Sequence, residues 1–178
     1  MRFNKTKKLK GEKIYLRAVY ASDARPEYVR WLNDKEVNQF LESRFKRYSL
    51  GKLRQYILTA SKDRDTLFLA IIRNEDNKHV GNIKLGPIDW NHKVGEIGIM
   101  IGDKASWGKG YATASINLLA AYAFEVLRLH KLTAGVYENN IGSYKAFKKC
   151  GFFEEGKLIK HYLYEGKYID GIRLVKLA

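Results

Sequence analysis

Apolar and polar residues alternate along several short segments of the chain, with the period of two that is typical of half-buried β-strands. The segment "KIYLRAV" is the first example. Other runs are apolar almost throughout and are bounded by polar turns, which indicates strands buried on both faces. The pattern predicts about seven strands, at residues 13–19, 66–72, 79–88, 94–101 and 132–137 and in a final hairpin over 157–177 that turns near Glu165 and Gly166.

Apolar residues three or four positions apart predict two helices before the second strand. The first lies within residues 22–34, where Ser22 or Asp23 is expected to cap its N-terminus. The second covers residues 49–61. Its expected buried stripe consists of Leu50, Leu53, Ile57 and Leu58.

Two further helices are predicted between the later strands, at residues 108–127 and 140–151. The first of them would connect the strand at 94–101 to the next strand as a crossover, which requires helices on both faces of one sheet. We therefore expect an α/β fold with a single mixed sheet. No linker divides the chain, so residues 1–178 are expected to form one domain that includes a basic N-terminal extension, residues 1–11.

The charge of the chain points to an anionic partner. Its 33 Lys and Arg residues exceed its 19 Asp and Glu residues, for a formal net charge of +14. Nucleic acid, a membrane surface and a phosphorylated small molecule all fit such a charge. The basic residues are spread over the whole chain, however, without the stripe expected of a nucleic-acid groove binder.

The cysteine count and the apolar runs indicate the compartment. Cys150 is the only cysteine, which excludes an internal disulfide and agrees with a reducing environment. The apolar run 118–124 is far shorter than the roughly 18 to 20 residues of a membrane span, and no signal-peptide pattern follows the N-terminus. We expect a cytoplasmic protein without a membrane span.

The segment "SWGKGYAT", residues 106–113, has the composition of an anion-binding turn. It follows a predicted strand and opens a predicted helix, where free backbone amides and the positive end of the helix dipole coincide. Gly108 and Gly110 allow close approach of a phosphate, and Lys109 adds charge. The spacing is neither a Walker A motif nor the dinucleotide fingerprint GxGxxG, because Thr113 replaces the third glycine.

The two segments "GEIGIMIGDKASWGKGYATAS" and "NNIGSYKAFKKCGF" together resemble the GNAT superfamily of acyl-CoA N-acyltransferases, and within it the branch of RimJ/RimL-type protein N-terminal acetyltransferases. The resemblance extends over most of the chain. It implies a mostly antiparallel mixed sheet whose fourth and fifth strands splay apart, with acetyl-CoA lying between them.

The resemblance also implies which residues hold the cofactor. The backbone amides of the turn would bind the pyrophosphate of coenzyme A, and the strand before the turn would offer backbone groups to the pantetheine arm and the thioester carbonyl. Asn140 would contact the pantetheine. The implied cofactor residues are Ile99, Met100, Ile101, Trp107, Gly108, Lys109, Gly110, Tyr111, Ala112, Thr113, Asn140 and Ser143.

Acetyl transfer needs a base for the amine and a proton for the departing thiolate. Glu96 is the candidate base, since it lies in the strand that leads to the acyl site; its alternative role is an ion pair between strands. Many relatives of the resembled family have a tyrosine as the acid at the position of Phe147, which cannot donate a proton. Ser143 is the nearest substitute, while Tyr144 is expected to point elsewhere.

The acceptor is expected between the N-terminal helices and the final hairpin, with Trp31, Asn33, Glu36 and Tyr162 as candidate contacts. A protein N-terminal α-amine or the amine of a nucleotide-linked amino sugar suits the positive charge better than a polyamine. Antibiotic and polyamine acetyltransferases of the same fold stay open, as does a noncatalytic nucleic-acid-binding module. We expect no metal ion and no stably bound nucleic acid; a homodimer is compatible with these features.

Overall fold

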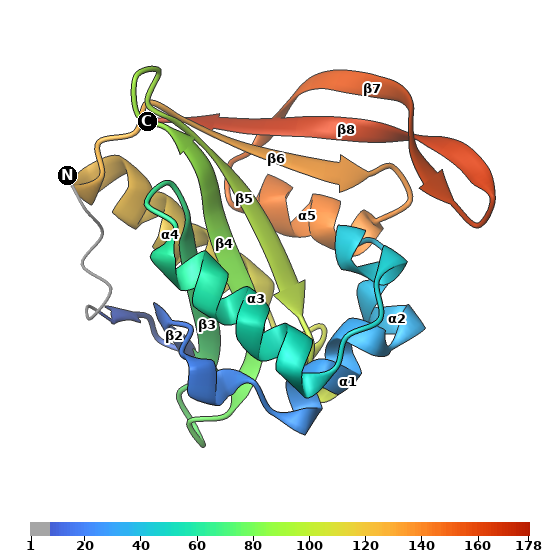
Figure 1. The fold of residues 1–178 in the computed structure, drawn as a ribbon. Coiled ribbons are helices and arrows are strands. Elements are labelled where there is room, and N and C mark those ends of the chain that lie inside the picture. Colours follow the sequence, from blue (N-terminus) through green and yellow to red (C-terminus); the bar gives the residue numbers. More distant parts are fainter. Residues whose placement is uncertain (1–7) are drawn as a thin grey trace.

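The computed structural model describes residues 8–178 and contains one sheet of eight strands (Figure 1). The strand order is β1-β2-β3-β4-β5-β6-β8-β7, and every neighbouring pair is antiparallel except β5 and β6. The predicted α/β class and mixed sheet are confirmed. The strands are β1 (Leu9–Lys10), β2 (Ile14–Ala18), β3 (Leu67–Arg73), β4 (His79–Asp89), β5 (Val94–Ile101), β6 (Lys131–Tyr137), β7 (Phe153–Tyr164) and β8 (Lys167–Leu177).

Strand β1 lies inside the segment that we predicted to be a basic extension, residues 1–11. It pairs with β2 through Leu9 and Lys10, so this part of the segment belongs to the sheet. Residues 1–7 lie outside the described part of the chain. The additional strand explains why the sheet has one strand more than the pattern predicted.

Helices cover both faces of the sheet (Figure 1). On one face, α1 and α3 pack on a cluster that includes Leu53 and Ile57. On the other, the main core includes residues of α4 and α5, such as Leu119 and Phe147. The helices are α1 (Pro26–Asn33), α2 (Lys35–Asn38), α3 (Leu50–Lys62), α4 (Tyr111–Ala121), which continues as a π-helical turn over Tyr122–Val126, and α5 (Ile141–Lys149).

Two details of the predicted helices are wrong. Helix α1 begins at Pro26 with Arg25 as its N-cap residue, whereas Ser22 and Asp23 precede it. In α3, Leu50 is 49% and Leu58 40% exposed, although Leu53 and Ile57 are buried as expected. Leu58 follows Ile57 by one position, which turns it about 100° away from the buried stripe, and Leu50 is the first residue of the helix.

Asp23 is buried because it has a stronger partner than a helix end. Its carboxylate accepts hydrogen bonds from both terminal nitrogens of Arg17, each at 2.7 Å, and from the backbone amide of Tyr20. Burial acts to raise the pKa of Asp23, but these donors favour the ionised form more, so the pKa lies below its ordinary value. The ion pair joins β2 to the segment that leads into α1.

We expect the Asp23→Asn variant to lose about 3 kcal/mol of unfolding free energy at pH 7, because it leaves a largely buried guanidinium without its counter-ion. Since the folded-state pKa of Asp23 is depressed, the stabilisation is present above its ordinary pKa and is lost as the pH falls through the depressed value. Urea unfolding from pH 7 to pH 3 should therefore show the difference between wild type and variant shrinking. A constant difference would contradict the assignment; Glu27→Gln, which breaks an ion pair with Arg30 in which both side chains are more than half exposed, is the control and should change the stability little.

Strands β5 and β6 pair over only three residues. Val94–Glu96 lie beside Lys131–Thr133, and beyond this point the two strands diverge (Figure 1). From Ile97 onward, β5 is paired with β4 alone, while β6 continues along β8. This is the splayed pair that we predicted; with β1 counted, the two strands are the fifth and sixth. The divergence leaves one edge of β5 open inside the sheet.

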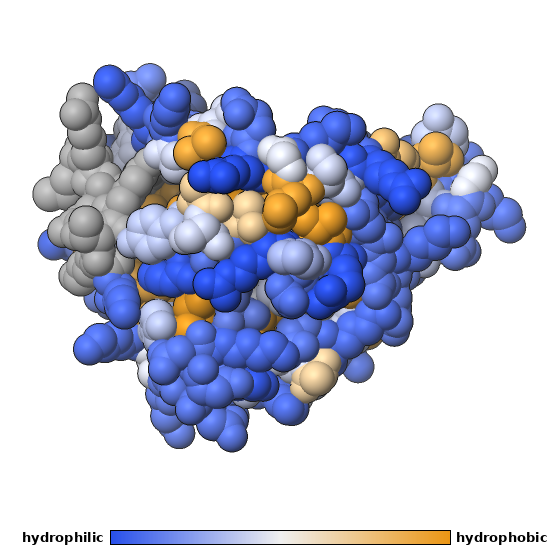
Figure 2. Space-filling view, turned by 60° about the horizontal axis from the view of Figure 1, so that its bottom comes forward, coloured by the Kyte–Doolittle hydropathy of each residue, from blue (hydrophilic) through white to orange (hydrophobic). Residues whose placement is uncertain are grey.

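The surface agrees with the charge of the chain. From the side shown in Figure 2, hydrophilic residues cover most of the face, and apolar ones gather near its middle. No helix among residues 8–178 is both long enough and apolar enough to cross a membrane.

Candidate functional site

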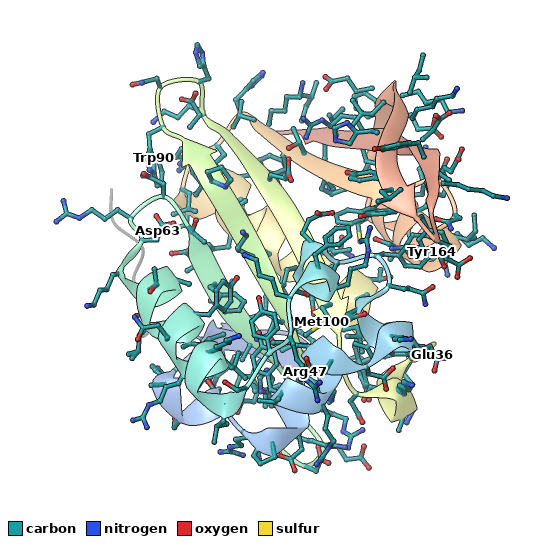
Figure 3. The ribbon with its side chains drawn as sticks, turned by 45° about the vertical axis from the view of Figure 1, so that its right-hand side comes forward. Glu36, Arg47, Asp63, Trp90, Met100 and Tyr164 are labelled. Atoms are coloured by element: carbon teal, nitrogen blue, oxygen red, sulfur yellow. The ribbon has the colours of Figure 1, made fainter. Side chains whose placement is uncertain are left out.

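A pocket of about 470 Å³ opens where β5 and β6 diverge. Four segments line it: α2 with the residues after it, the open end of β5, the loop that leads into α4 with the first turn of that helix, and one side of α5. Met100 and Glu36, which lie on different segments, are labelled in Figure 3. The lining residues are Glu36, Val37, Gln39, Phe40, Leu41, Ile99, Met100, Ile101, Ser106, Trp107, Gly108, Gly110, Tyr111, Ala112, Thr113, Asn140, Gly142, Ser143, Lys145, Ala146 and Lys149.

The loop before α4 presents a series of free backbone donors. The first hydrogen bond of α4 runs from the amide of Ala114 to the carbonyl of Gly110. Within the described chain, the amides from Gly108 to Thr113 have no hydrogen-bond acceptor. The positive end of the helix dipole lies at the same place, so the loop can bind a polyphosphate through its backbone.

Glycine is required at two positions of this loop. Gly108 and Gly110 have φ angles of 72° and 81°, in the left-handed region that side chains disfavour. A Cβ added at either position would meet no atom within 4 Å, so the space above both glycines is open. The backbone of the loop is therefore accessible to a ligand.

Trp107 and Lys109 are placed differently from the other predicted loop residues. The amide of Trp107 already donates to the carbonyl of Lys104, and its indole Nε1 donates to the carbonyl of Ile101 at 2.8 Å. Lys109 does not line this pocket; it lies beside a second, more open cavity next to Arg73 and Tyr111. Trp107 thus fixes the loop to the end of β5 and does not offer its amide.

Along β5, the backbone N–H and C=O groups of every second residue face the open edge. The amide of Gly102 donates to the carbonyl of Val80 in β4, and in an antiparallel pair the residues that face the partner strand alternate. The backbone groups of Met100 therefore face β4, while those of Ile99 and Ile101 face the gap. The open edge offers the amides of Ile99 and Ile101; Met100 also lines the pocket, and it packs against the cluster beneath α1 and α3.

Helix α5 forms the opposite wall. Asn140 is its N-cap residue and accepts a hydrogen bond from the amide of Ser143 at 3.2 Å. Ser143 lines the pocket, and its hydroxyl has no hydrogen-bond partner among residues 8–178. Phe147 is buried against Phe152 in the core. Tyr144 donates its hydroxyl to Glu154, a bond that raises its pKa.

The carboxylates near the gap are paired within the chain. Glu96 accepts a hydrogen bond from Arg173 of β8 at 2.8 Å, which is the inter-strand ion pair that we considered for it. Glu36 pairs with Lys104 at 2.6 Å. Glu96 does not line the pocket of 470 Å³; its side chain points to the face of the sheet that α1 and α3 cover.

Trp31 and Asn33, two predicted acceptor contacts, hold the fold together. Trp31 packs over Gly102, where an added Cβ would lie 2.1 Å from its ring, and against His79. The side chain of Asn33 joins α1 to Tyr48, accepting from its amide and donating to its carbonyl at 2.9 Å each. Neither residue lines the pocket.

Tyr137 on β6 anchors a network that we did not predict from the sequence. Its hydroxyl donates to Glu42 at 2.8 Å and accepts from Arg44 at 2.6 Å. Burial raises the pKa of Tyr137 to about 12; the guanidinium of Arg44 opposes this rise and the carboxylate of Glu42 adds to it. Arg44 also donates to the carbonyl of Leu163 in β7. The network joins the segment after α2 to the final hairpin; alternation in "LTAGVY" placed Tyr137 in a strand but could not reveal its partners.

Among residues 8–178, no group of three or more His, Cys, Asp or Glu side chains could hold a metal ion. Cys150 is buried, and burial raises the pKa of its thiol to about 11.

Comparison with known proteins shows what this arrangement resembles. Residues 13–153 match the acetyltransferase (GNAT) domain. Probable N-acetyltransferase YjcK of Bacillus subtilis is 30% identical over 169 residues, which cover 91% of this chain and 92% of that protein. A spermidine N(1)-acetyltransferase of Vibrio cholerae is 31% identical over 104 residues, 58% of this chain and 60% of that protein.

The fold has solved counterparts as well. The crystal structure of spermidine N-acetyltransferase from Vibrio cholerae in complex with CoA and spermine superimposes with a TM-score of 0.83 at 25% identity, over 94% of this chain and 96% of that one.

Proposed function

Because the chain belongs to the GNAT acetyltransferase family, we propose that it transfers the acetyl group of acetyl-CoA to a primary amine by direct attack of the amine. The chain is an acyltransferase, and acetyl-CoA is its acyl donor. Within the family, we place it with the RimJ/RimL-type enzymes on the segments "WGKGYA" and "NNIGS".

The residues around the pocket fit acetyl-CoA. Six free amides, from Gly108 to Thr113, suit the pyrophosphate, and Lys145 and Lys149 add positive charge to the lining. The open edge of β5 offers the amides of Ile99 and Ile101 to the pantetheine arm and the thioester carbonyl. When bound, acetyl-CoA supplies the activated acetyl group.

Glu96 and Ser143 are the proposed groups for proton transfer. The carboxylate of Glu96 lies on the face of the sheet opposite α4, and Arg173 fixes its orientation. Ser143 lines the pocket on the α5 side with a free hydroxyl, in a position to donate to the departing thiolate. The two groups thus lie on opposite sides of the gap, as an incoming amine and a leaving thiolate require.

The pairing of the carboxylates supports an acceptor with a single amine. Glu36 and Glu96 are each paired with a cation of this chain, Lys104 and Arg173, while Glu42 accepts a hydrogen bond from the neutral hydroxyl of Tyr137. A polycation would need carboxylates that are free to neutralise it, and the chain already has a net charge of +14. We therefore propose a protein N-terminal α-amine or the amine of an amino sugar linked to a nucleotide.

A polyamine is the second candidate. It is favoured by the similarity to a spermidine N(1)-acetyltransferase and by the solved structure of such an enzyme with CoA and spermine. For this chain to bind a polyamine through Glu36, the acceptor would have to displace Lys104, whereas Glu42 is held by the neutral hydroxyl of Tyr137 and could pair with an ammonium group directly.

A panel of amines distinguishes the candidates. The protein and acetyl-CoA are incubated with an alanine-initiated peptide, a nucleotide-linked amino sugar and spermidine, and the acetylated products are quantified by mass spectrometry. We expect kcat/KM for the peptide or the amino sugar to exceed that for spermidine at least tenfold. The reverse order would favour the polyamine, and the absence of product from every amine would contradict the proposed function.

A further inference from the structure

Tyr162 reaches the site because strand β7 is irregular before it. Leu158 pairs with Gly171 of β8, but Tyr162 pairs with Ile169, so three residues of β7 lie opposite one of β8. Lys160, inside this bulge, has a φ of 48°, and its amide donates to Asp170 at 2.7 Å. The bulge changes the direction of β7 and turns the ring of Tyr162 onto the sheet.

Two glycines and an aromatic ring hold Tyr162 in place. Its ring stacks on that of Tyr137, with 3.9 Å between centroids and 10° between planes. A Cβ added at Gly171 would lie 2.6 Å from the ring, and one added at Gly135 would lie 3.0 Å from the hydroxyl oxygen. A side chain at either position would displace Tyr162, so the hydroxyl lies directly over β6 at Gly135.

Gly135 lies where β6 has separated from β5. The last paired residue of β6 toward β5 is Thr133, and alternation turns Gly135 and Tyr137 to the same face as Glu96 of β5. The hydroxyl of Tyr162 is therefore next to the open gap, on the side of the sheet away from α4 and α5. We infer that an acceptor approaches from this side, because the loop before α4 and helix α5 line the part of the pocket that suits the cofactor, and α2 with the residues after it completes the lining.

The hydroxyl of Tyr162 has no hydrogen-bond partner in the described part of the chain, unlike that of Tyr137. Burial raises the pKa of Tyr162, and the negative charge of Glu96 raises it further. The phenol therefore keeps its proton at neutral pH. A neutral hydroxyl beside a carboxylate offers an oxygen lone pair to an incoming N–H group.

We propose that the hydroxyl of Tyr162 accepts a hydrogen bond from the acceptor amine and orients its lone pair toward the acetyl carbon. This inference rests on the proposed function. It concerns the amine group, which every candidate acceptor has, and it names Tyr162 as the residue that contacts this group. The proton that the amine loses passes to Glu96, while the C–N bond forms and the electrons of the C–S bond stay with sulfur. Tyr162 neither gains nor loses a proton.

The test removes the hydroxyl alone. The substrate is whichever amine of the panel above (alanine-initiated peptide, amino-sugar nucleotide or spermidine) reacts best. For Tyr162→Phe we expect kcat/KM for this amine to fall at least tenfold, the effect of a lost hydrogen bond to a reacting group. The dissociation constant for that amine, measured by calorimetry with coenzyme A present, should rise. Affinity for coenzyme A alone and the melting temperature should change little.

Tyr56→Phe is the control, because the ring of Tyr56 also makes an aromatic contact, with Phe68, and its hydroxyl also has no partner among residues 8–178, although the residue is more exposed than Tyr162. Gly135→Ala should reproduce the defect of Tyr162→Phe by displacing the hydroxyl. A Tyr162→Phe variant with unchanged kcat/KM and amine affinity would overturn the inference. Failure of the wild type to acetylate any amine would instead refute the proposed function.

Discussion

We expect the Gly110→Val variant to bind coenzyme A about 100-fold more weakly than the wild type. Gly110 has a φ of 81°, which a β-branched side chain does not tolerate, and it precedes the first residue of α4. The substitution should change the backbone conformation of the loop, so that its free amides no longer point toward the pyrophosphate. The valine side chain would also enter the open space above the loop. Calorimetric titration with coenzyme A measures the loss.

A control must separate the backbone strain of a valine at positive φ from the loss of coenzyme A binding. Gly166, in the turn between β7 and β8, has a φ of 77° and also has no atom within 4 Å of an added Cβ. Gly166→Val should therefore destabilise the fold by a similar amount and leave the affinity for coenzyme A unchanged. Equal losses of affinity in both variants would show that the loop has no specific part in binding.

We expect Glu96→Gln to lower kcat by about 100-fold while leaving the affinity for coenzyme A within twofold of the wild type. General-base catalysis contributes on this scale, and glutamine retains the shape of the side chain but cannot accept a proton. The ion pair with Arg173 is partly exposed, so its loss alone should cost little stability. Steady-state kinetics with the best amine of the panel and calorimetry with coenzyme A separate the two effects.

Glu155 provides the matched control, because it forms an ion pair with Lys131 between strands of the same sheet. Glu155→Gln should leave kcat unchanged. If Glu96→Gln also leaves it unchanged, Glu96 is an inter-strand ion-pair partner and a water chain must deprotonate the amine. For an α-amine such a chain is sufficient, since deprotonation at pH 7 costs only about 1 kcal/mol.

The features that depend on local sequence were predictable. The strand pattern, the turn at Glu165 and Gly166 and the glycine loop before α4 each arise from neighbours along the chain, and the structure contains all of them. The splayed strands followed from the resemblance to a family. The free amides of the loop could also be expected, because a helix always leaves its first amides without internal partners.

The features that depend on distant partners were not predictable. Asp23 looked like a helix cap, but Arg17 on β2 binds it more strongly than a helix end would. Trp31 was a candidate acceptor contact from its side-chain type alone; its packing depends on the space above Gly102, about seventy residues away. Tyr162 was a candidate from its side-chain type alone; its position depends on a bulge in β7 and on two glycines in other strands.

Residue-resolved amide hydrogen exchange, with and without coenzyme A, tests the central claim most directly. Among residues 8–178, the amides from Gly108 to Thr113 and those of Ile99 and Ile101 have no acceptor, so they should exchange quickly in the protein alone. We predict that coenzyme A slows exchange at the loop amides and at Ile99 and Ile101. Exchange at Met100, whose amide is already bonded to β4, should be the same with and without coenzyme A. Binding that leaves these amides unprotected, or protects a different surface, would contradict the account.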